Sequence, residues 1–371
     1  MSRILITGGA GFIGSHLADL LISHEHHVRV LDSLSPQVHG SDGTKPQYLS
    51  DDVEFIRGDV RDRMAVHRAL QGVDAVVHLA AAVGVGQSMY EIADYVAAND
   101  LGTAVLLEAL LKRPVGRLVV ASSMSVYGEG LGRKADGTEV DPAERSREQL
   151  RRGQWEPEAS DGEPLTPIAT PETKQPALSS IYALNKFTQE QMCLLFGRAY
   201  DVPTTALRFF NVYGTRQALS NPYTGVLAIF GSRLLNGRPP LIFEDGQQRR
   251  DFVHVRDVAR ACLAGLASDR GAGRAINVGS GVSRTVEEVA RALSRAVHRE
   301  GLHPQVTGKS RSGDIRHCFA DTSLARDLLG FQAEEEFEAG LRELAEWWVG
   351  RIATDRVEDA MIELEQRGLV A

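Results

Sequence analysis

The chain of 371 residues carries 41 Lys and Arg against 49 Asp and Glu, a formal net charge of -8, and 43% of its residues are hydrophobic. The acidic balance argues against nucleic acid as a general partner, because phosphate binding favours a basic face, and the hydrophobic share excludes global disorder. The three cysteines, Cys193, Cys262 and Cys318, are widely spaced and form no C-x-x-C pair, so neither a disulfide framework nor a zinc site is expected. There is no apolar run of about 20 residues, as a membrane span would need, and no signal-peptide pattern after Met1, so we expect a cytoplasmic protein with no membrane partner.

Short apolar runs alternate with segments of helical periodicity through the first 210 residues. The runs predict strands at Arg3–Thr7, Val28–Leu31, Val53–Ile56, Ala75–Leu79, Leu118–Ala121 and Thr205–Phe209. Helices are predicted between them at Phe12–Ser23, Met64–Leu70, Tyr90–Leu111 and Ser180–Arg198. This alternation is typical of a parallel sheet wrapped by helices, so we expect an α/β fold with a doubly wound, Rossmann-like sheet.

Two regions depart from the alternation. Residues 129–176 are polar and rich in proline near their end; Asp141 and Pro142 predict the N-cap and first position of a short helix through Arg152, with the remainder an extended loop. After residue 210 the pattern is irregular and closes with amphipathic helices at Glu336–Trp348 and Val357–Arg367. We therefore expect a Rossmann domain over residues 1–210, with 129–176 as an insertion and the chain returning at about 252–278, and a smaller C-terminal lobe over 211–371.

A glycine-rich turn joins the first predicted strand to the first helix. Gly8, Gly11 and Gly14, with Phe12 and Ile13 between them, allow a tight turn and a close approach to a pyrophosphate, which the N–H groups of the helix N-terminus then hold. A glycine triplet alone also occurs in ordinary turns.

The acid that completes this pattern is Asp32, which ends the second predicted strand. A carboxylate there accepts both ribose hydroxyls of NAD, whereas the 2′-phosphate of NADP would meet a like charge. NAD is therefore the expected cofactor.

Two further groups follow the third and fourth predicted strands. Asp59 and Val60 are placed for the adenine edge, and Leu79, Ala80 and Ala81 for the backbone beside the cofactor. Packing against a buried strand would also select small residues at these positions.

Tyr182 and Lys186 are four residues apart in a predicted helix and therefore share a face. A phenol with a pKa of about 10 is a poor base at neutral pH. An adjacent ammonium and the positive nicotinamide favour the phenolate, which can exchange a proton with a substrate hydroxyl. Taken alone, this spacing also occurs on ordinary surface helices.

The run Ser122-Ser123-Met-Ser125-Val-Tyr-Gly ends the fifth predicted strand. With the glycine turn and the Tyr-x-x-x-Lys pair, it resembles the extended short-chain dehydrogenase/reductases of the NAD-dependent epimerase/dehydratase family. The resemblance implies that Ser123, Tyr182 and Lys186 are catalytic, and that Asn99 supports the site beside the cofactor. From the residues alone, Asn99 is equally well a polar residue that distorts a helix. The family's usual homodimer, a four-helix bundle, implies that Tyr90–Leu111 and Ser180–Arg198 form an interface here.

Three later motifs resemble the sugar-nucleotide branch of that family: Arg208-Phe-Phe-Asn211, Arg249-Arg250-Asp251 and Arg311-Ser-Gly-Asp314. The resemblance implies that Ser125, Asn211, Arg250 and Arg311 bind a dTDP- or UDP-linked sugar. A guanidinium suits this role because its fork donates two hydrogen bonds to phosphate oxygens. Considered singly, each arginine would more often be a solvated surface charge.

The two residues after Ser123 suggest the reaction. Dehydratases of the family carry an Asp-Glu pair at these positions, which are Met124 and Ser125 here, and the glutamate of the related decarboxylases is absent too. These residues cannot supply acid–base chemistry for elimination, so oxidation at C4 and re-reduction from the other face, a 4-epimerisation, is expected. By resemblance, the runs 36–40 and 221–226 and the insertion are most similar to 4-epimerases acting on dTDP-L-rhamnose.

Two other functions stay open. A dehydrogenase or reductase that releases its cofactor would share every motif, whereas a non-catalytic NAD-binding regulator would not need the catalytic trio. His24, His26 and His27 lie close together but without carboxylate or cysteine partners, so no metal is expected. Both ends of the insertion must return to the catalytic side of the sheet, so we expect a lid that substrate orders; the alternative is a surface decoration.

Overall fold

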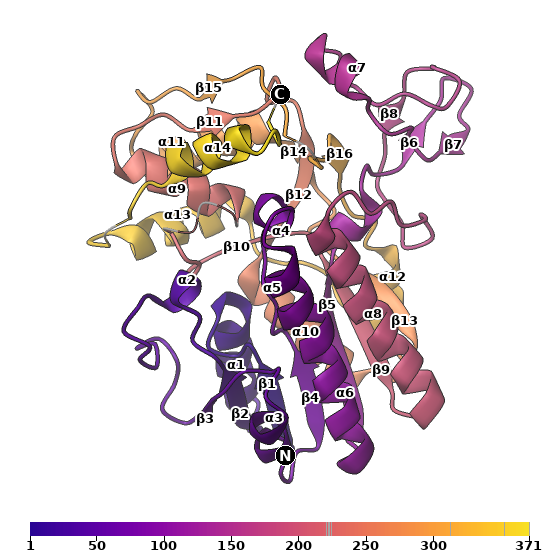
Figure 1. Ribbon diagram of the computed structural model, residues 1–371, viewed down its shortest axis with the longest axis vertical. Helices are drawn as coiled ribbons and strands as arrows, with labels where there is room; N and C mark the ends of the chain where they lie inside the picture. The colour runs from indigo at the N-terminus through magenta and orange to yellow at the C-terminus, as the bar shows by residue number, and fades with distance from the viewer. Residues whose placement is uncertain (220, 222, 224, 312, 352, 371) are drawn as a thin grey trace.

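The computed structural model describes residues 1–219, 221, 223, 225–311, 313–351 and 353–370. A seven-stranded parallel sheet forms the larger part (Figure 1), in the order β13-β9-β5-β4-β1-β2-β3. Its strands are β1 (Arg3–Thr7), β2 (His27–Asp32), β3 (Glu54–Arg57), β4 (Ala75–His78), β5 (Arg117–Ser123), β9 (Thr204–Phe209) and β13 (Arg274–Val278). The strand order reverses between β1 and β4, where doubly wound sheets leave a crevice at their carboxyl ends. The predicted fold class is confirmed.

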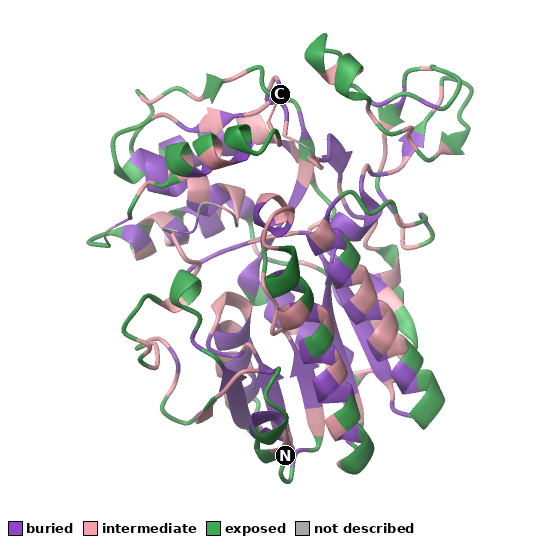
Figure 2. Cartoon of the chain, in the orientation of Figure 1, coloured by how far each residue is buried: buried purple, intermediate pink, exposed green. Residues whose placement is uncertain are grey.

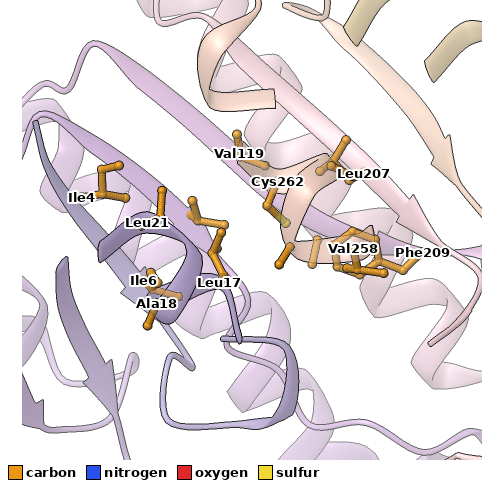
Figure 3. Packing of buried hydrophobic residues seen from close by; sticks show 14 of the residues in the cluster. Ile4, Ile6, Leu17, Ala18, Leu21, Val119, Leu207, Phe209, Val258 and Cys262 are labelled. Carbon is orange, nitrogen blue, oxygen red and sulfur yellow. The ribbon is translucent and has the colours of Figure 1, made fainter. Parts of the chain in front are cut away.

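Helices cover both faces of this sheet. One face carries α1 (Phe12–Ser23), α10 (Val255–Ala267) and α12 (Ser323–Leu329), and the other carries α3 (Arg63–Ala69), α6 (Gly102–Lys112) and α8 (Ile181–Tyr200). Figure 3 shows Leu17 and Leu21 of α1 and Cys262 of α10 lying against the sheet. All the strands except β3, which forms an edge of the sheet, are largely buried (Figure 2), which explains their nearly continuous apolar sequence.

The segment expected to be one helix over Tyr90–Leu111 is instead divided. The short helices α4 (Val85–Ser88) and α5 (Ile92–Val96) precede a π-helical turn, η1 (Ala97–Leu101), which continues into α6. The π turn holds Asn99 fully buried, with its amide bonded to both backbone groups of Ala82, to the N at 2.7 Å and to the O at 3.1 Å. A π-helical turn holds one residue more than an α-helical turn, and here it places the Asn99 side chain so that it fixes the backbone of Ala82, just after β4.

The C-terminal lobe contains a second sheet, in which β12 (Arg249–His254) pairs with β10 (Asn211–Tyr213), β14 (Ser283–Thr285) and β16 (His317–Cys318). A separate pair joins β11 (Leu241–Ile242) to β15 (Gln305–Val306). The helices of the lobe are α9 (Val226–Leu235), α11 (Val286–Ala296), α13 (Phe337–Trp348) and α14 (Val357–Gln366), while α2 (Pro36–His39) follows β2. A core of its own, which includes Phe230, Leu293 and Trp348, holds the lobe together.

The insertion (residues 129–176) follows a 3₁₀ turn, η2 (Met124–Tyr127), and projects at the upper right of Figure 1. It contains a small sheet of β7 (Glu139–Val140), β6 (Gly132–Arg133) and β8 (Thr166–Pro167), and the helix α7 (Arg147–Arg151). The prediction of a helix capped by Asp141 was wrong, because Ser146 caps α7 by accepting from the Gln149 N at 3.1 Å. Residue 143 is held extended because its N donates to the Glu158 O at 2.8 Å.

Buried ion pairs fasten the insertion to the C-terminal lobe. Glu129 accepts from the backbone N of Arg316 at 2.8 Å and of His317 at 3.0 Å. Arg145 and Arg316, with side chains 5% and 1% exposed, both donate to Glu244, at 2.7 and 2.9 Å. Losing one member of such a buried set leaves a charge uncompensated, so the attachment is firm.

The residues that the structure describes contain neither a membrane-spanning helix nor a cluster of metal-binding side chains. None of their helices is both long and apolar enough to cross a membrane. Nor do their His, Cys, Asp and Glu side chains form a group of three or more that could hold a metal ion.

Candidate active site

A cavity of about 680 Å³ opens where the carboxyl ends of the sheet strands meet the C-terminal lobe. The glycine turn and the ends of β2, β4 and β5 line one end, and residues from the segments 209–213 and 217–227 line the other. Tyr182 and Lys186 from α8 lie along its wall. The cavity is therefore placed where both a dinucleotide and a second ligand can meet the catalytic pair.

The glycine turn forms a cradle that side chains would fill. Gly8 has φ of 71°, and a Cβ there would lie 2.8 Å from the Ala80 N. A Cβ on Gly14 would lie 2.5 Å from the Gly8 O. Gly11 caps α1 without a side-chain hydrogen bond, so the first-turn N–H groups are available to a pyrophosphate. This geometry fits NAD.

Asp32 lies at the edge of this cradle, 8% exposed. Its carboxylate accepts from the Ala10 N at 3.0 Å and the Leu34 N at 2.9 Å, which fixes its orientation. Asp59 also lines the cavity, and hydrogen bonds from Arg61 hold its pKa below the usual value. Val60, Leu79, Ala80 and Ala81 line the cavity as well. Asn99, which was also expected beside the cofactor, does not line the cavity, and its role there stays a prediction.

Ser123 and Tyr182 form a hydrogen-bonded pair on the wall of the cavity. Burial raises the pKa of Tyr182 to about 12, and the hydrogen bond with Ser123 lowers it in part. The Ser123 Oγ also donates to the Ser125 Oγ at 3.1 Å. Tyr182 lies in the first turn of α8, where its N donates to the Ser88 Oγ at 3.0 Å. Tyr182 is therefore a protonated phenol at neutral pH.

Lys186 lies one turn along the helix from Tyr182. Burial lowers the pKa of its ammonium to about 8, while the nearby Cys193, Glu190 and Asp100 raise it in part. The ammonium form thus predominates at pH 7. Its Nζ donates to the Gln189 Oε1 at 2.8 Å.

Residues 4–149 and 158–279 match the model of the NAD dependent epimerase/dehydratase family. The chain belongs to this family. It is similar to the dTDP-L-rhamnose 4-epimerase of Burkholderia thailandensis, with 37% identity over 350 residues that cover 93% of this chain and 94% of the relative.

Solved structures of family members have the same fold. The UDP-glucose 4-epimerase of Thermotoga maritima with UDP-glucose is 31% identical at a TM-score of 0.75, covering 94% of this chain and 98% of that one. The Thermus thermophilus UDP-glucose 4-epimerase complex with NAD is 31% identical at 0.73, covering 94% and 99%. This member of the epimerase/dehydratase family is thus an enzyme, and NAD is its cofactor, as Asp32 predicts.

On the substrate side, the structure brings only part of the predicted set to the cavity. Ser125 and Asn211 line it, and the Asn211 Oδ1 is buried without a hydrogen-bond partner. Arg250 instead donates to the backbone O of Arg316 at 2.9 Å and to that of Ile315. It does not line the cavity, so its role toward a diphosphate stays a prediction.

Arg311 is likewise engaged elsewhere. Its Nε donates to the Asp314 Oδ2 at 2.8 Å, and its guanidinium lies 4.4 Å from the centroid of the Phe243 ring. It does not line the cavity either. Ser312 in this motif, and Pro222 and Thr224 in the run 221–226, lie outside the described residues.

A belt of amide and phenol groups at the substrate end was not predicted. The Gln37 Nε2 donates to the Gln87 Oε1 at 2.9 Å and the Asn221 Oδ1 at 3.3 Å, and the Tyr95 hydroxyl donates to the Gln87 Oε1 at 3.1 Å. Tyr223 also lines the cavity. Distant segments supply these residues, so no motif in the sequence could have grouped them.

The C-terminal helix α14 also reaches this end of the site. The Glu363 Oε2 accepts from the Tyr223 hydroxyl at 2.8 Å and from the Tyr90 hydroxyl at 3.1 Å. By contrast, no residue of the insertion lines the cavity, although the whole segment is described. The structure therefore does not place the insertion as the expected lid, because its contacts fasten it to the C-terminal lobe instead.

Proposed function

We propose that this enzyme is a nucleotide-sugar 4-epimerase acting on a dTDP-hexose, with dTDP-L-rhamnose as the first substrate to test. The observation that carries the proposal is the surface beside Ser123 and Tyr182. The two residues after Ser123 are Met124, which is 6% exposed, and Ser125, whose hydroxyl is bonded to Ser123. Neither is an acid or base that could remove water from a sugar ring.

Carboxylates do line other parts of the cavity. Among the described residues they are Asp32 and Asp59 at the cofactor end, and Glu91 and Asp94 from α5 and its N-cap. None belongs to the β5–η2 turn that carries Ser123. This distribution favours oxidation and re-reduction of a hydroxyl over elimination.

The chemistry follows from the catalytic groups. Bound NAD supplies a reversible hydride acceptor. Tyr182, as the phenolate, takes the proton of the 4-hydroxyl, while Ser123 is hydrogen-bonded to the same oxygen and the Lys186 ammonium stabilises the phenolate. The resulting 4-keto sugar turns over within the cavity, and Tyr182 returns the proton to the oxygen when the opposite face is reduced.

The substrate end of the cavity supports a neutral sugar. Its belt offers the amides of Gln37, Gln87 and Asn221 and the phenols of Tyr95 and Tyr223. The described Lys and Arg side chains that line the cavity are Arg61, beside Asp59, and Lys186. The carboxylate of a hexuronate would lose its hydration in this cavity without gaining an ion pair with an arginine. This desolvation costs free energy, whereas a neutral hexose hydroxyl carries no charge to desolvate. The dTDP moiety rests on the likeness to the rhamnose epimerase.

A substrate panel tests this proposal. Purified enzyme is incubated separately with dTDP-L-rhamnose, dTDP-glucose, UDP-glucose and UDP-glucuronate, and the products are followed by proton NMR and nicotinamide absorbance. We expect the C4 epimer of a neutral sugar, without net reduction of added NAD. Stoichiometric reduction with an oxidised sugar would instead establish the alternative, a dehydrogenase that releases its cofactor. A 4-keto-6-deoxy product formed from dTDP-glucose or UDP-glucose without net reduction of NAD would show loss of water and overturn the epimerase assignment.

A further inference from the structure

A row of buried polar side chains lies behind the catalytic pair and runs from the sheet into the helices that cover one of its faces. It begins at Thr7 of β1, continues through His78 of β4 and Thr103 of α6, and ends at Gln189 of α8, all 1% exposed or less. The His78 Nδ1 lies 2.7 Å from the Thr7 Oγ1, and the His78 Nε2 lies 2.9 Å from the Thr103 Oγ1. The Gln189 Nε2 donates to the same Thr103 Oγ1 at 2.9 Å.

The direction of these hydrogen bonds is set at Thr103. Its hydroxyl donates to the backbone O of Asn99 at 2.6 Å, which uses its one proton. Thr103 must therefore accept from both His78 and Gln189. A glutamine can donate only from its nitrogen, so the amide of Gln189 has one orientation and its Oε1 points away from Thr103.

The other end of the row agrees with that assignment. The Ala80 N donates to the Thr7 Oγ1 at 3.3 Å, which leaves the Thr7 proton for the His78 Nδ1. His78 then carries its proton on Nε2 and is neutral. Burial lowers the pKa of His78 to about 3, so this neutral form persists across the range in which enzymes work.

The consequence reaches Lys186. Its Nζ donates to the Gln189 Oε1 at 2.8 Å, and the described part of the chain offers this ammonium no other hydrogen-bond acceptor. We propose that Gln189 is a positioning residue, which the Thr103–His78 row orients so that its carbonyl holds the charged form of Lys186 beside Tyr182. The inference deepens the proposed function, on which its catalytic meaning rests.

Other titratable groups surround Lys186 on the elements packed against it; they are Asp100 of η1, His78 of β4, and Tyr182, Glu190 and Cys193 of α8. Glu190 is already paired with Arg208 at 2.6 Å, and Asp100 accepts from the Asn185 Nδ2 at 2.7 Å. Gln189 is thus the group that touches the ammonium directly. Removing its carbonyl disfavours the charged form and lowers the pKa of Lys186, whereas a carboxylate in its place raises that pKa.

The protein allows a direct measurement, because it contains only six lysines: Lys45, Lys112, Lys134, Lys174, Lys186 and Lys309. Lysine labelled with ¹³C at Cε is incorporated, and the full-length protein without substrate is titrated by NMR, with Lys186→Met assigning the signal. We expect Gln189→Leu to lower the midpoint of Lys186 by about one pH unit, and Gln189→Glu, which has nearly the same shape, to raise it by a similar amount. Gln191→Leu, the same change two residues along α8, removes a 3.2 Å hydrogen bond to Glu190 but no contact with Lys186, and Glu190 stays paired with Arg208, so the midpoint should stay in place.

Opposite shifts in two variants of one residue cannot come from a general loosening of the fold. Unchanged midpoints, or shifts of the same sign in both variants, would overturn the proposal. In turnover, the alkaline limb of the kcat profile should move in the same directions while KM changes little. If the titration shifts as expected but no nucleotide sugar is epimerised, Gln189 still positions Lys186 and the proposed function fails. If a nucleotide sugar is epimerised but the midpoint of Lys186 does not shift, the proposed function stands and the role of Gln189 fails.

Discussion

Glu129→Gln is the sharpest test of how the insertion is held. The Glu129 carboxylate accepts from three donors, and each oxygen faces two of them: Oε1 faces the Arg145 Nε, Oε2 faces the His317 N, and the Arg316 N–H is shared between both oxygens. Glutamine has almost the same shape but carries an NH₂ group on one side. In either orientation of the amide, its NH₂ group faces N–H donors, from which it cannot accept a hydrogen bond.

The magnitude follows from that count. About two hydrogen bonds to a charged acceptor are lost, each worth about 1.5 to 3 kcal/mol, and the Glu129 side chain is only 14% exposed, so solvent compensates little. We expect the free energy of local opening around residues 315–318 to fall by about 3 to 5 kcal/mol. A loss of about 3 kcal/mol corresponds to amide exchange on the order of 100-fold faster.

Hydrogen exchange measured by mass spectrometry reads this directly, because the amides of Arg316 and His317 are themselves two of the donors. The matched control is Glu139→Gln in the same insertion. Its ion pair with Arg133 has both side chains about half exposed, so exchange should change less than about threefold. Wild-type protection at residues 315–318 in Glu129→Gln would refute the account of the attachment.

Four further predictions concern the site and the assembly. Tyr182→Phe should reduce kcat by about 100- to 10,000-fold with NAD affinity unchanged in equilibrium titration, because it removes only the phenolic proton carrier; a wild-type rate would end this assignment. Asp32→Asn should weaken NAD binding by about 1.5 to 3 kcal/mol, and an unchanged Kd would move the ribose site elsewhere. A hydrogen bond from His317, followed by those from Arg316, lowers the pKa of Glu156 from 4.5 to about 2, so its stabilisation is complete above about pH 4.5 and is lost as the pH falls toward 2. Pepsin should begin to cut the insertion in that window, and Glu156→Gln should abolish the pH dependence; cleavage that is independent of pH in the wild type would contradict it. The predicted homodimer should sediment at about twice 40.4 kDa, and Leu195→Glu, which charges a side chain 53% exposed on α8, should yield monomers; a wild-type monomer at micromolar concentration would exclude the interface.

The parts of the structure that the sequence predicted are those governed by local rules. Five of the six strands expected in the first 210 residues are almost entirely buried, and only β3, at the edge of the sheet, is partly exposed, so each appears as a short apolar run between turn residues. The glycine turn was predictable because Gly8 and Gly14 leave no space for a Cβ. The Tyr182–Lys186 pair was found because a helix brings residues four apart onto one face.

The failures occurred where distant contacts override a local preference. Asp141 and Pro142 form a good helix start, but Asp141 pairs with Lys174 at 3.4 Å and the Ala143 N is bonded to Glu158, so the chain stays extended. The π turn that carries Asn99 was missed because the apolar periodicity hardly changes over a single extra residue.

The substrate side shows the same limit. Arg250 was expected at a diphosphate, yet backbone carbonyls of residues 315 and 316 take its guanidinium. Glu363 contacts Tyr90 across a separation of 273 residues, and neither residue lies in a motif. Such pairings depend on the tertiary fold, and local patterns in a single sequence do not reveal which distant residues the fold brings together.

The attachment of the insertion also bears on how the protein is made. Glu129 precedes His317 by 188 residues. At a synthesis rate of about 5 to 20 residues per second, His317 is therefore made about 10 to 40 s after Glu129, and the Glu129 carboxylate lacks this partner during that time. Over part of that interval β9 is an open sheet edge as well, because β13, which pairs with it, is made some 65 residues later. A nascent chain that stalls before residue 274 therefore exposes the unpaired edge of β9 while the insertion is not yet attached to the C-terminal lobe. We expect the protein to depend most on chaperones at this stage of its synthesis.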